Sequence, residues 1–415
     1  MLLQADGRPP GTARGTRAVP ASPYPFCRLA TPPRAVRAIA RERRGASPVG
    51  NARERGALFY REAGQFKTTY AADMAVFPIR QDRIGLALIL AVAFIAIPAF
   101  GNAFFIETMM IPFLVLSLGA IGLNLLTGYT GLLSLGSAGF MGVGAYACYK
   151  LDTYFPQVNV LVWILVSGLF SSAVGVVFGL PSLRIKGFYL AVATLAAQFF
   201  LEWAFARVPW LYNNNTSGAI EVGDHTLFGL VITGPNATPS TRYLVALSIT
   251  TALAWIASNI THGRIGRMWM AVRDMDIAAE LIGIRLLRAK LLAFAVSSYF
   301  VGVAGAMMVY LWFGSAEPEA FNIDLSFQLL FIIIIGGLGS IVGAFFGAAI
   351  LHLLPIVLRA LPPLVGVNVQ AATVEQLTFM VTGALIIVVL IVEPHGLAAL
   401  WKTAKQKLRV WPFPY

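Results

Sequence analysis

Residues 263–290, GRIGRMWMAVRDMDIAAELIGIRLLRAK, form a polar stretch between two long apolar runs, and we call this stretch the island. Its five arginines and one lysine outnumber its three acidic residues. Its apolar residues recur every three or four positions, which predicts one amphipathic helix over residues 268–281. The predicted apolar stripe consists of Met268, Val272, Met275, Ala279 and Ile282. Two interpretations stay open: a surface for a water-soluble partner, or a loop that is basic only because it faces the cytoplasm.

The composition is that of a protein that crosses a membrane several times. Hydrophobic residues make up 58% of the 415 residues and charged residues 12%, whereas soluble domains average about 25% charged residues. Most of the net charge of +12 lies before residue 58, so it does not indicate a nucleic-acid partner. Cys27 lies in a basic segment and Cys148 in an apolar one, which favours neither a disulfide nor a metal site.

The first 57 residues differ from the rest of the chain. They hold eleven arginines against three acidic residues, and they contain no apolar core of the kind that a secretory signal needs. We predict a disordered Arg- and Pro-rich leader over residues 1–57, because such a segment cannot bury enough apolar surface to fold. Two origins stay open: translated upstream DNA behind a misplaced start codon, which the few serines favour, and a transit peptide. Residues 58–83 are predicted to be a cytoplasmic N-terminal segment.

Apolar runs follow one another through residues 84–392, which predicts an all-α polytopic membrane domain. The run 327–358 has 32 residues and is interrupted by the sequence GGLGS at 336–340. A single pass would leave the basic tail outside the cell, so we predict a glycine-broken pair of passes, the first of which is short or re-entrant. This interpretation gives about ten transmembrane crossings. They are 84–100, 104–126, 132–151, 158–180, 188–206, 243–260, 291–313, two within 327–358, and 376–392.

Basic residues predict the orientation of these crossings, because they concentrate in cytoplasmic loops. Arg80 and Arg83 precede the first crossing, and counting from there places the island in the cytoplasm. The long loop 207–242, whose charges cancel, is then outside the cell. The tail, residues 393–415, is basic and returns to the cytoplasm, so both termini are predicted to be cytoplasmic.

Small residues recur at helical spacing in two of the predicted crossings, which allows helices to approach closely. Tight packing alone explains this pattern, and a second interpretation is that the same residues line a translocation path. The similarity of the two segments also hints at an internal duplication. The path candidates are Ser134, Ser137, Gly139 and Gly142 in the third crossing, and Gly339, Ser340 and Gly343 in the ninth.

Ionisable residues inside crossings are costly and are therefore candidates for function. Glu202 lies five residues before Arg207, which favours an ion pair at the membrane surface, or snorkelling of the side chain to that surface, over a proton relay. His352 stands alone, and such a histidine is more often a hydrogen-bonded structural residue. The sequence contains no G-x-x-x-x-G-K-[ST] phosphate loop, no H-E-x-x-H and no nucleophile elbow, so we predict no enzyme, no cofactor and no metal in this chain. Energy for transport would come from another chain or from an ion gradient.

Five segments in order resemble the LIV-type permease family, and within it the M-type membrane subunit of branched-chain amino acid ABC importers. The resemblance implies a second, H-type permease subunit, two cytoplasmic ATPase subunits that hydrolyse ATP, and a periplasmic substrate-binding protein, besides membrane lipid. It also implies a bacterial inner membrane. The segments are TGYTGLLSLGSAGFMGVGAY (127–146), LRIKGFYLAVATL (183–195), GRIGRMWMAVRDMDIAAELIGI (263–284), FIIIIGGLGSIVGAFFG (331–347) and EPHGLAALW (393–401).

The resemblance gives the island a role, because importers of this kind dock a cytoplasmic E-A-A-x-x-x-G loop on the ATPase. Ala278, Ala279 and Gly283 match the second half of that pattern, whereas Ile277 stands where the glutamate is expected. We expect Gly283 to end the helix in a left-handed conformation. The implied coupling residues are Arg273, Asp276, Ala278, Ala279, Glu280 and Gly283.

Three functions remain open at this stage. The first is a permease subunit for branched-chain amino acids, and the second is the same kind of subunit for urea or short amides. The third is a gradient-driven secondary transporter or a channel without an ATPase. Neighbouring genes for ATPases and for a binding protein would favour the first two over the third.

Overall fold

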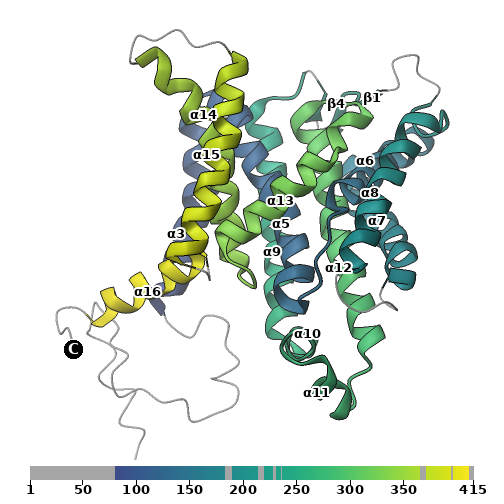
Figure 1. The fold of residues 1–415 in the computed structure, drawn as a ribbon. Helices are drawn as coiled ribbons and strands as arrows, with labels where there is room; N and C mark the ends of the chain where they lie inside the picture. The colour runs from purple at the N-terminus through teal and green to yellow at the C-terminus, as the bar shows by residue number, and fades with distance from the viewer. Residues whose placement is uncertain are drawn as a thin grey trace, which may run out of the picture. The chain divides into compact units, whose positions relative to one another are not determined.

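The computed structural model describes residues 80–182, 189–213, 219–227, 230–234, 236–364, 371–393 and 396–410. The predicted leader and nearly all of the predicted segment 58–83 lie outside the described residues. The described part is almost entirely helical (Figure 1). In chain order, its helices are α3 (Arg80–Ala91), α4 (Ile97–Phe100), α5 (Ile111–Thr130), α6 (Ser137–Tyr154), α7 (Val160–Ser182), α8 (Tyr189–Arg207), α9 (Pro239–His262), α10 (Arg264–Asp274), α11 (Asp276–Leu281), α12 (Leu286–Met307), α13 (Ile323–Gly336), α14 (Ile341–Leu364), α15 (Ala371–Val392) and α16 (Leu397–Val410).

Short helical turns of other types join or extend these helices. Three are π-helical, namely η1 (Val92–Ala96), η2 (Phe105–Met110) and η3 (Met308–Phe313). The turn η4 (Pro318–Phe321) is a 3-10 helix before α13. Four short strands pair in two small antiparallel sheets: β1 (Ile220–Glu221) with β4 (Ser315–Ala316), and β2 (His225–Leu227) with β3 (Leu230–Thr233).

Among the described residues, eight helices are long and apolar enough to cross a membrane. The bent pair Gln376–Val392 and Leu397–Lys407 would make a ninth span. The predicted class, an all-α polytopic membrane protein, is therefore confirmed, and eight or nine of the ten predicted crossings consist of helices this long and apolar. The eight helices are Asp82–Phe100, Phe105–Thr130, Val160–Pro181, Tyr189–Arg207, Pro239–His262, Leu286–Phe313, Pro318–Gly336 and Ile341–Ala360.

The third predicted crossing, at α6, is the one that is absent from these nine spans. Gly131 ends α5 in a left-handed conformation, with φ 71°, and residues 131–136 are not helical, so the predicted helix over 132–151 is wrong at its beginning. The helix α6 also carries Lys150 and Asp152, which lower its hydropathy. Most of its residues are buried by other helices, so α6 does not need the apolar surface that lipid would demand.

The predicted glycine-broken pair is confirmed by α13 and α14. The first helix ends at Gly336 and the second begins at Ile341. Gly337 and Gly339 adopt φ angles of 113° and 78°, which glycine takes without the strain that a side chain would cause. With 14 residues, α13 alone is about 21 Å long, and the turn η4 before it extends the apolar span to Pro318–Gly336.

Helix α12 packs against α5, α6 and α7 at the centre of the bundle. The contacts are close because glycines face backbone: a Cβ on Gly144 would overlap the carbonyl group of Gly302, and one on Gly305 would overlap that of Met141. Small residues at a helix interface strengthen van der Waals packing in this way.

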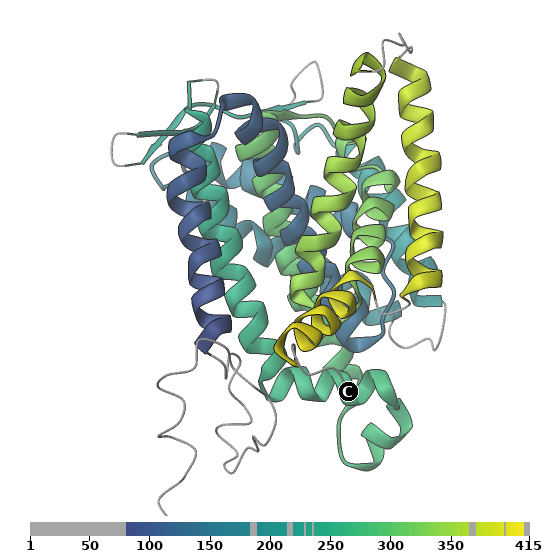
Figure 2. The ribbon, with the colours of Figure 1, turned by 90° about the vertical axis from the view of Figure 1, so that its left-hand side faces the viewer.

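Two ends of the bundle are distinct in both views of the ribbon. Helices α10 and α11 lie at one end, which we call the island end (Figures 1 and 2). The strands lie at the opposite end, which we call the hairpin end after β2 and β3. The sequence order accounts for this separation, because α9 leads from the hairpin to the island in a single helix of 24 residues.

Candidate functional site

The island folds as two helices rather than the single helix predicted over 268–281. Met275 is extended, with φ −154° and ψ 102°, and it separates α10 from α11. Helix α10 is anchored by Trp269, which is fully buried and donates a hydrogen bond from Nε1 to the carbonyl of Ala289 (3.2 Å). The break therefore frees α11 to project from an anchored helix.

The apolar stripe predicted for the island is only partly buried. Val272 and Ala279 pack with Ala289 in a small buried cluster, as the stripe predicts. Met275 and Ile282, by contrast, are 70% and 75% exposed, so the stripe is not buried along its whole length. Exposed apolar side chains consequently surround α11: Met275 (70%), Ile277 (70%), Leu281 (84%) and Ile282 (75%).

Gly283 ends α11 as predicted, in a left-handed conformation with φ 91°. Its N–H donates to the carbonyl of Glu280 (3.0 Å), and the N–H of Ile284 donates to the carbonyl of Ala279 (3.0 Å). This pair of bonds is the Schellman motif, in which Ile284 also packs near Ala279. Of the other predicted coupling residues, Arg273, Ala278 and Glu280 are exposed, Asp276 is half-buried and Ala279 is buried.

Arg273 joins the island to the membrane helices. Its Nη1 donates to the carbonyl of Gly128 near the C-terminal end of α5 (2.9 Å), and its Nε contacts Asp274 (3.1 Å). The same region holds Asn124, whose Oδ1 accepts from the N–H of Gly339 and whose Nδ2 donates to the carbonyl of Ser340 (both 2.8 Å). Thus α10, α5 and the α13–α14 connection meet at one junction. No pattern in the sequence predicts the part of Asn124 in this junction.

Two of the path candidates of the third crossing, Gly139 and Gly142, lie against α8. Ser134 and Ser137 are buried, and a Cβ on Gly139 or Gly142 would meet side chains of α8. Gln198 on α8 accepts from the N–H of Gly139 (2.5 Å) and donates to the carbonyl of Phe321 (2.7 Å). The N–H of Gly139, near the beginning of α6, thus has a hydrogen-bond partner inside the protein.

The path candidates of the ninth crossing belong to a different contact. Gly339 and Ser340 form the α13–α14 connection at the Arg273 junction, and Gly343 lies against the backbone of Gly336. The two groups of candidates therefore pack against different helices, and their part in a translocation path stays a prediction.

A cleft of about 820 Å³ opens beside the island. Residues 130–133 line one wall, Leu190 and Ala191 of α8 line another, and α10 and α11 close it with residues from Val272 to Leu281. The cleft thus reaches from the exposed island to the non-helical segment before α6, where a solute would meet backbone as well as side chains.

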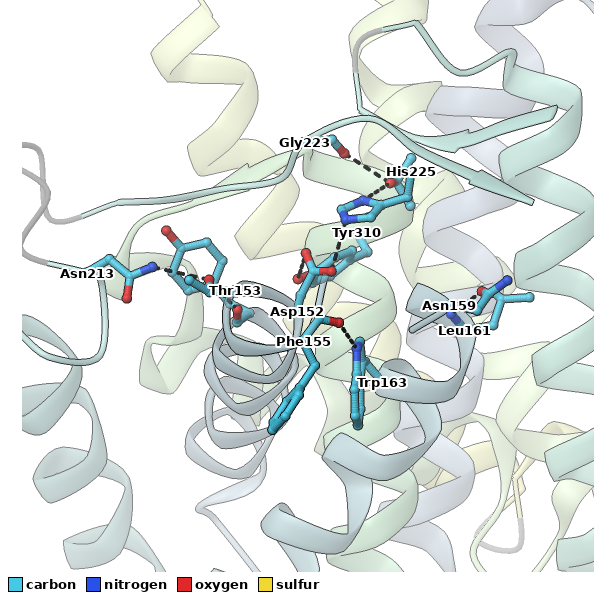
Figure 3. A network of polar contacts seen from close by, with 12 residues as sticks. Asp152, Thr153, Phe155, Asn159, Leu161, Trp163, Asn213, Gly223, His225 and Tyr310 are labelled. Atoms are coloured by element: carbon cyan, nitrogen blue, oxygen red, sulfur yellow. Dashed lines mark hydrogen bonds and ion pairs between the residues drawn. The ribbon is translucent and has the colours of Figure 1, made fainter. Parts of the chain in front are cut away.

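Polar contacts hold the hairpin end together (Figure 3). His225 of β2 contacts Asp152 Oδ1 through Nε2 (2.9 Å) and Thr233 Oγ1 through Nδ1 (2.8 Å). Tyr310 donates its hydroxyl to Asp152 Oδ2 (3.2 Å). The pKa of His225 is raised above its ordinary value, chiefly because Asp152 accepts its hydrogen bond and stabilises the protonated ring. No local sequence pattern marks this contact, because its residues come from three separate segments.

The two ionisable residues singled out in the sequence lie at different places. His352 on α14 bonds the carbonyl of Thr108 through Nε2 (2.8 Å), which agrees with a structural histidine. Glu202 is half-buried, and no ion pair between it and Arg207 occurs in the described part of the chain.

Comparisons with known proteins point to one family. The family described as "branched-chain amino acid transport system / permease component" matches residues 105–390. Two relatives are 30% identical over 315 residues, which cover 70% of this chain and 69% of each relative. Both are described as the high-affinity branched-chain amino acid transport system permease protein LivM, one from Salmonella typhimurium and one from Escherichia coli K12. No solved structure matches the chain.

Proposed function

Because the chain belongs to the family of permease components of branched-chain amino acid transport systems, we propose that it is one membrane subunit of an ATP-driven importer for branched-chain amino acids. In this proposal it resides in a bacterial inner membrane, with the island end in the cytoplasm and the hairpin end in the periplasm. Its partners are a second permease subunit, two ATPase subunits that hydrolyse the ATP, and a periplasmic substrate-binding protein. The chain itself needs no cofactor.

The exposed apolar surface of α11 is the observation that carries the proposed docking. Met275, Ile277, Leu281 and Ile282 are each at least 70% exposed, although α11 is only six residues long. A group of large apolar side chains at a water-facing end is costly unless a partner covers it. An ATPase groove would bury these side chains, while α10 stays fixed to the bundle through Trp269.

The junction at Arg273 supplies a route from the motor to the membrane helices. Movement of α11 and α10 would displace Arg273, which is bonded to α5 at Gly128. Asn124 then connects α5 to the α13–α14 connection through two hydrogen bonds. Closure of the ATPase dimer would in this way tilt packed helices as rigid bodies, which is a common form of alternating access.

Substitution of α11 tests the docking. In the reconstituted complex, Leu281→Asp should abolish uptake and the ATPase stimulation by loaded binding protein, because a carboxylate would enter the apolar contact. Ile265→Asp is the matched control, since Ile265 is also exposed and lies on α10 of the same island. A cysteine at position 281 should also form a cross-link to the ATPase. Normal uptake by Leu281→Asp, with no ATPase in the purified complex, would contradict the importer and favour a gradient-driven transporter or a channel.

A further inference from the structure

Helix α16 leaves the direction of the span that precedes it. The bend between Gln376–Val392 and Leu397–Lys407 is 47°, and α16 lies towards the island end in both ribbon views (Figures 1 and 2). With 22 residues, α15 is about 33 Å long, which is enough to cross a hydrocarbon core without α16. Only residues 393–396 connect the two helices, so the start of α16 lies within about 18 Å of the end of α15.

The residues of α16 are typical of a helix at a membrane surface. Its sequence, LAALWKTAKQKLRV, contains three lysines and one arginine but no acidic residue. Leu397, Trp401 and Ala404 recur at intervals of four and three residues, so they share one face. Leu400 and Trp401 are apolar, yet they are 41% and 57% exposed. Tryptophan next to lysine is common in helices that lie at the boundary between headgroups and acyl chains.

The bundle fixes the position of α16 near its beginning. A Cβ on Gly396 would lie 2.5 Å from the Cα of Gly337, so the residue before α16 packs directly on the α13–α14 connection. Trp401 packs edge-on against Phe346 of α14, with ring centres 5.9 Å apart. These contacts hold one side of Trp401 while more than half of its surface stays exposed.

An ion pair places the second half of α16 at the level of the bilayer surface. Lys405 Nζ lies 2.5 Å from Asp82 Oδ1. Asp82 is the first residue of the apolar span 82–100, so this contact marks the end of the hydrocarbon region on that side of the protein. Lys402 and Lys407 are exposed and form no hydrogen bond or ion pair within the described residues. Two ammonium groups are therefore left without a partner in this part of the chain, close to the headgroups.

From this arrangement we propose that α16 binds the headgroups of anionic phospholipids in the bilayer that the chain itself spans. Lys402 and Lys407 pair with the headgroups, and Leu400 and Trp401 lie against the adjoining part of the acyl chains. Basic residues near an anionic lipid surface contribute through their charge, and apolar residues through the area that the lipid buries. An acidic water-soluble partner would have to reach α16 at the bilayer surface, whereas the lipid is already there. This surface goes beyond the proposed function, because its chemistry does not depend on the cargo.

Direct lipid binding tests this surface. The full chain, purified in detergent with the subunits that accompany it, should bind a fluorescent short-chain phosphatidylglycerol at least about tenfold more tightly than the phosphatidylcholine analogue, because two lysines act together. The double variant Lys402→Gln, Lys407→Gln should lose this preference. The matched control is Arg264→Gln, Arg267→Gln, which also removes two exposed positive charges at the island end and should keep the preference.

A dye on α16 tests the apolar half of the contact. In a background without Cys27 and Cys148, a polarity-sensitive dye on Leu400→Cys should report an apolar environment in vesicles that contain phosphatidylglycerol, and a more aqueous one in vesicles of phosphatidylcholine alone. Gln406→Cys is the matched position, because Gln406 is exposed and polar, and its dye should report water in both kinds of vesicle.

Three outcomes would overturn the lipid surface. Equal binding of the two lipids, or equal loss of the preference in the two double variants, would show only a general attraction to a basic end. Release of phosphatidylglycerol by inorganic phosphate at the same concentration would indicate a site for soluble anions. A dye at position 400 that is shielded equally in both kinds of vesicle would show that another protein subunit covers α16. None of these measurements uses transport, so failure of the importer proposal would leave their result unchanged.

Discussion

The guanidinium of Arg273 lies 2.9 Å from the carbonyl oxygen of Gly128 and donates a hydrogen bond to it across 145 positions of sequence. The last carbonyls of a helix lack partners within the helix and carry a partial negative charge, so a cation there is stabilising. A Cβ on Gly339 would lie 3.4 Å from both Arg273 Nη1 and the Gly128 oxygen. The island, α5 and the α13–α14 connection are thereby within reach of a single side chain.

Loss of this hydrogen bond should uncouple transport. Arg273→Gln shortens the side chain and removes the charge, and a hydrogen bond from a charged group contributes about 1.5–3 kcal/mol. We expect uptake by the reconstituted complex to fall at least about tenfold while ATP hydrolysis continues. Arg264→Gln, an exposed position on the same helix, is the control. Equal uptake by both variants would exclude Arg273 from the transmission of movement.

Stability at the hairpin end should depend on pH through His225. Its pKa is raised above the ordinary 6.5 by the bond to Asp152, and Asp224 adds to the same direction. A group whose folded pKa is raised contributes stability below the unfolded pKa and loses it as the pH rises through the folded value. Hydrogen exchange of residues 219–227 and 230–234 should therefore be slower at pH 6 than at pH 9, after correction for intrinsic exchange.

His225→Gln is the control for that pH dependence, because glutamine keeps hydrogen-bonding capacity without titrating. The variant should show the same protection at both pH values. If the parent protein shows equal protection at pH 6 and pH 9, the His225–Asp152 contact does not hold the hairpin.

Packing at the centre of the bundle should tolerate no methyl group at Gly144. A Cβ there would overlap the Gly302 carbonyl, so Gly144→Ala forces α6 and α12 apart, and overpacking of this kind costs about 1–3 kcal/mol. Gly383 is the matched control, since it is also helical and a Cβ on it meets nothing within 4 Å. In a background that lacks Cys27, the buried Cys148 thiol provides the readout, because a thiol-reactive dye reports its exposure on heating. Equal midpoints for the two variants would contradict the close contact.

Much of this fold could be predicted from local sequence. Runs of about twenty apolar residues have few alternatives to a membrane helix, and the helices α5, α7, α8, α9 and α12 follow. The glycines at 336, 337 and 339 predict the break between α13 and α14. Gly337 and Gly339 have positive φ angles, which glycine adopts without strain. Gly283 is predictable for the same reason.

The rest depends on contacts that no local pattern records. Helix α6 begins at Ser137 because Ser326 and Gln198, which are 188 and 59 positions away, satisfy the N–H groups of Ala138 and Gly139. The break at Met275 has no glycine or proline to mark it. The helical spacing of apolar residues continues through Met275, so the pattern alone predicts an unbroken helix that packs this side chain against the chain's own core. In the structure the Met275 side chain is exposed instead.

At Gly283, backbone strain can be separated from crowding. A Cβ at this position meets nothing within 4 Å, so within this chain the effect of a substitution comes from the φ angle of 91°. A left-handed conformation costs a residue with a side chain about 1–2 kcal/mol, and more for a β-branched one. Gly283→Val should therefore unwind the end of α11 and redirect residues 285–290. We expect lost uptake, with the subunit still in the membrane and stimulation by the binding protein abolished.

Gly283→Asn is the matched variant, because asparagine accepts the left-handed conformation far more readily than valine while adding a side chain of similar size. Uptake and ATPase stimulation should largely survive in Gly283→Asn and be lost in Gly283→Val. This contrast assigns the effect to the backbone turn that ends α11. Loss of activity in both variants would instead show that the exposed surface at Gly283 touches a partner, since any added side chain would then interfere. Full activity of Gly283→Val would show that the end of α11 has no part in coupling.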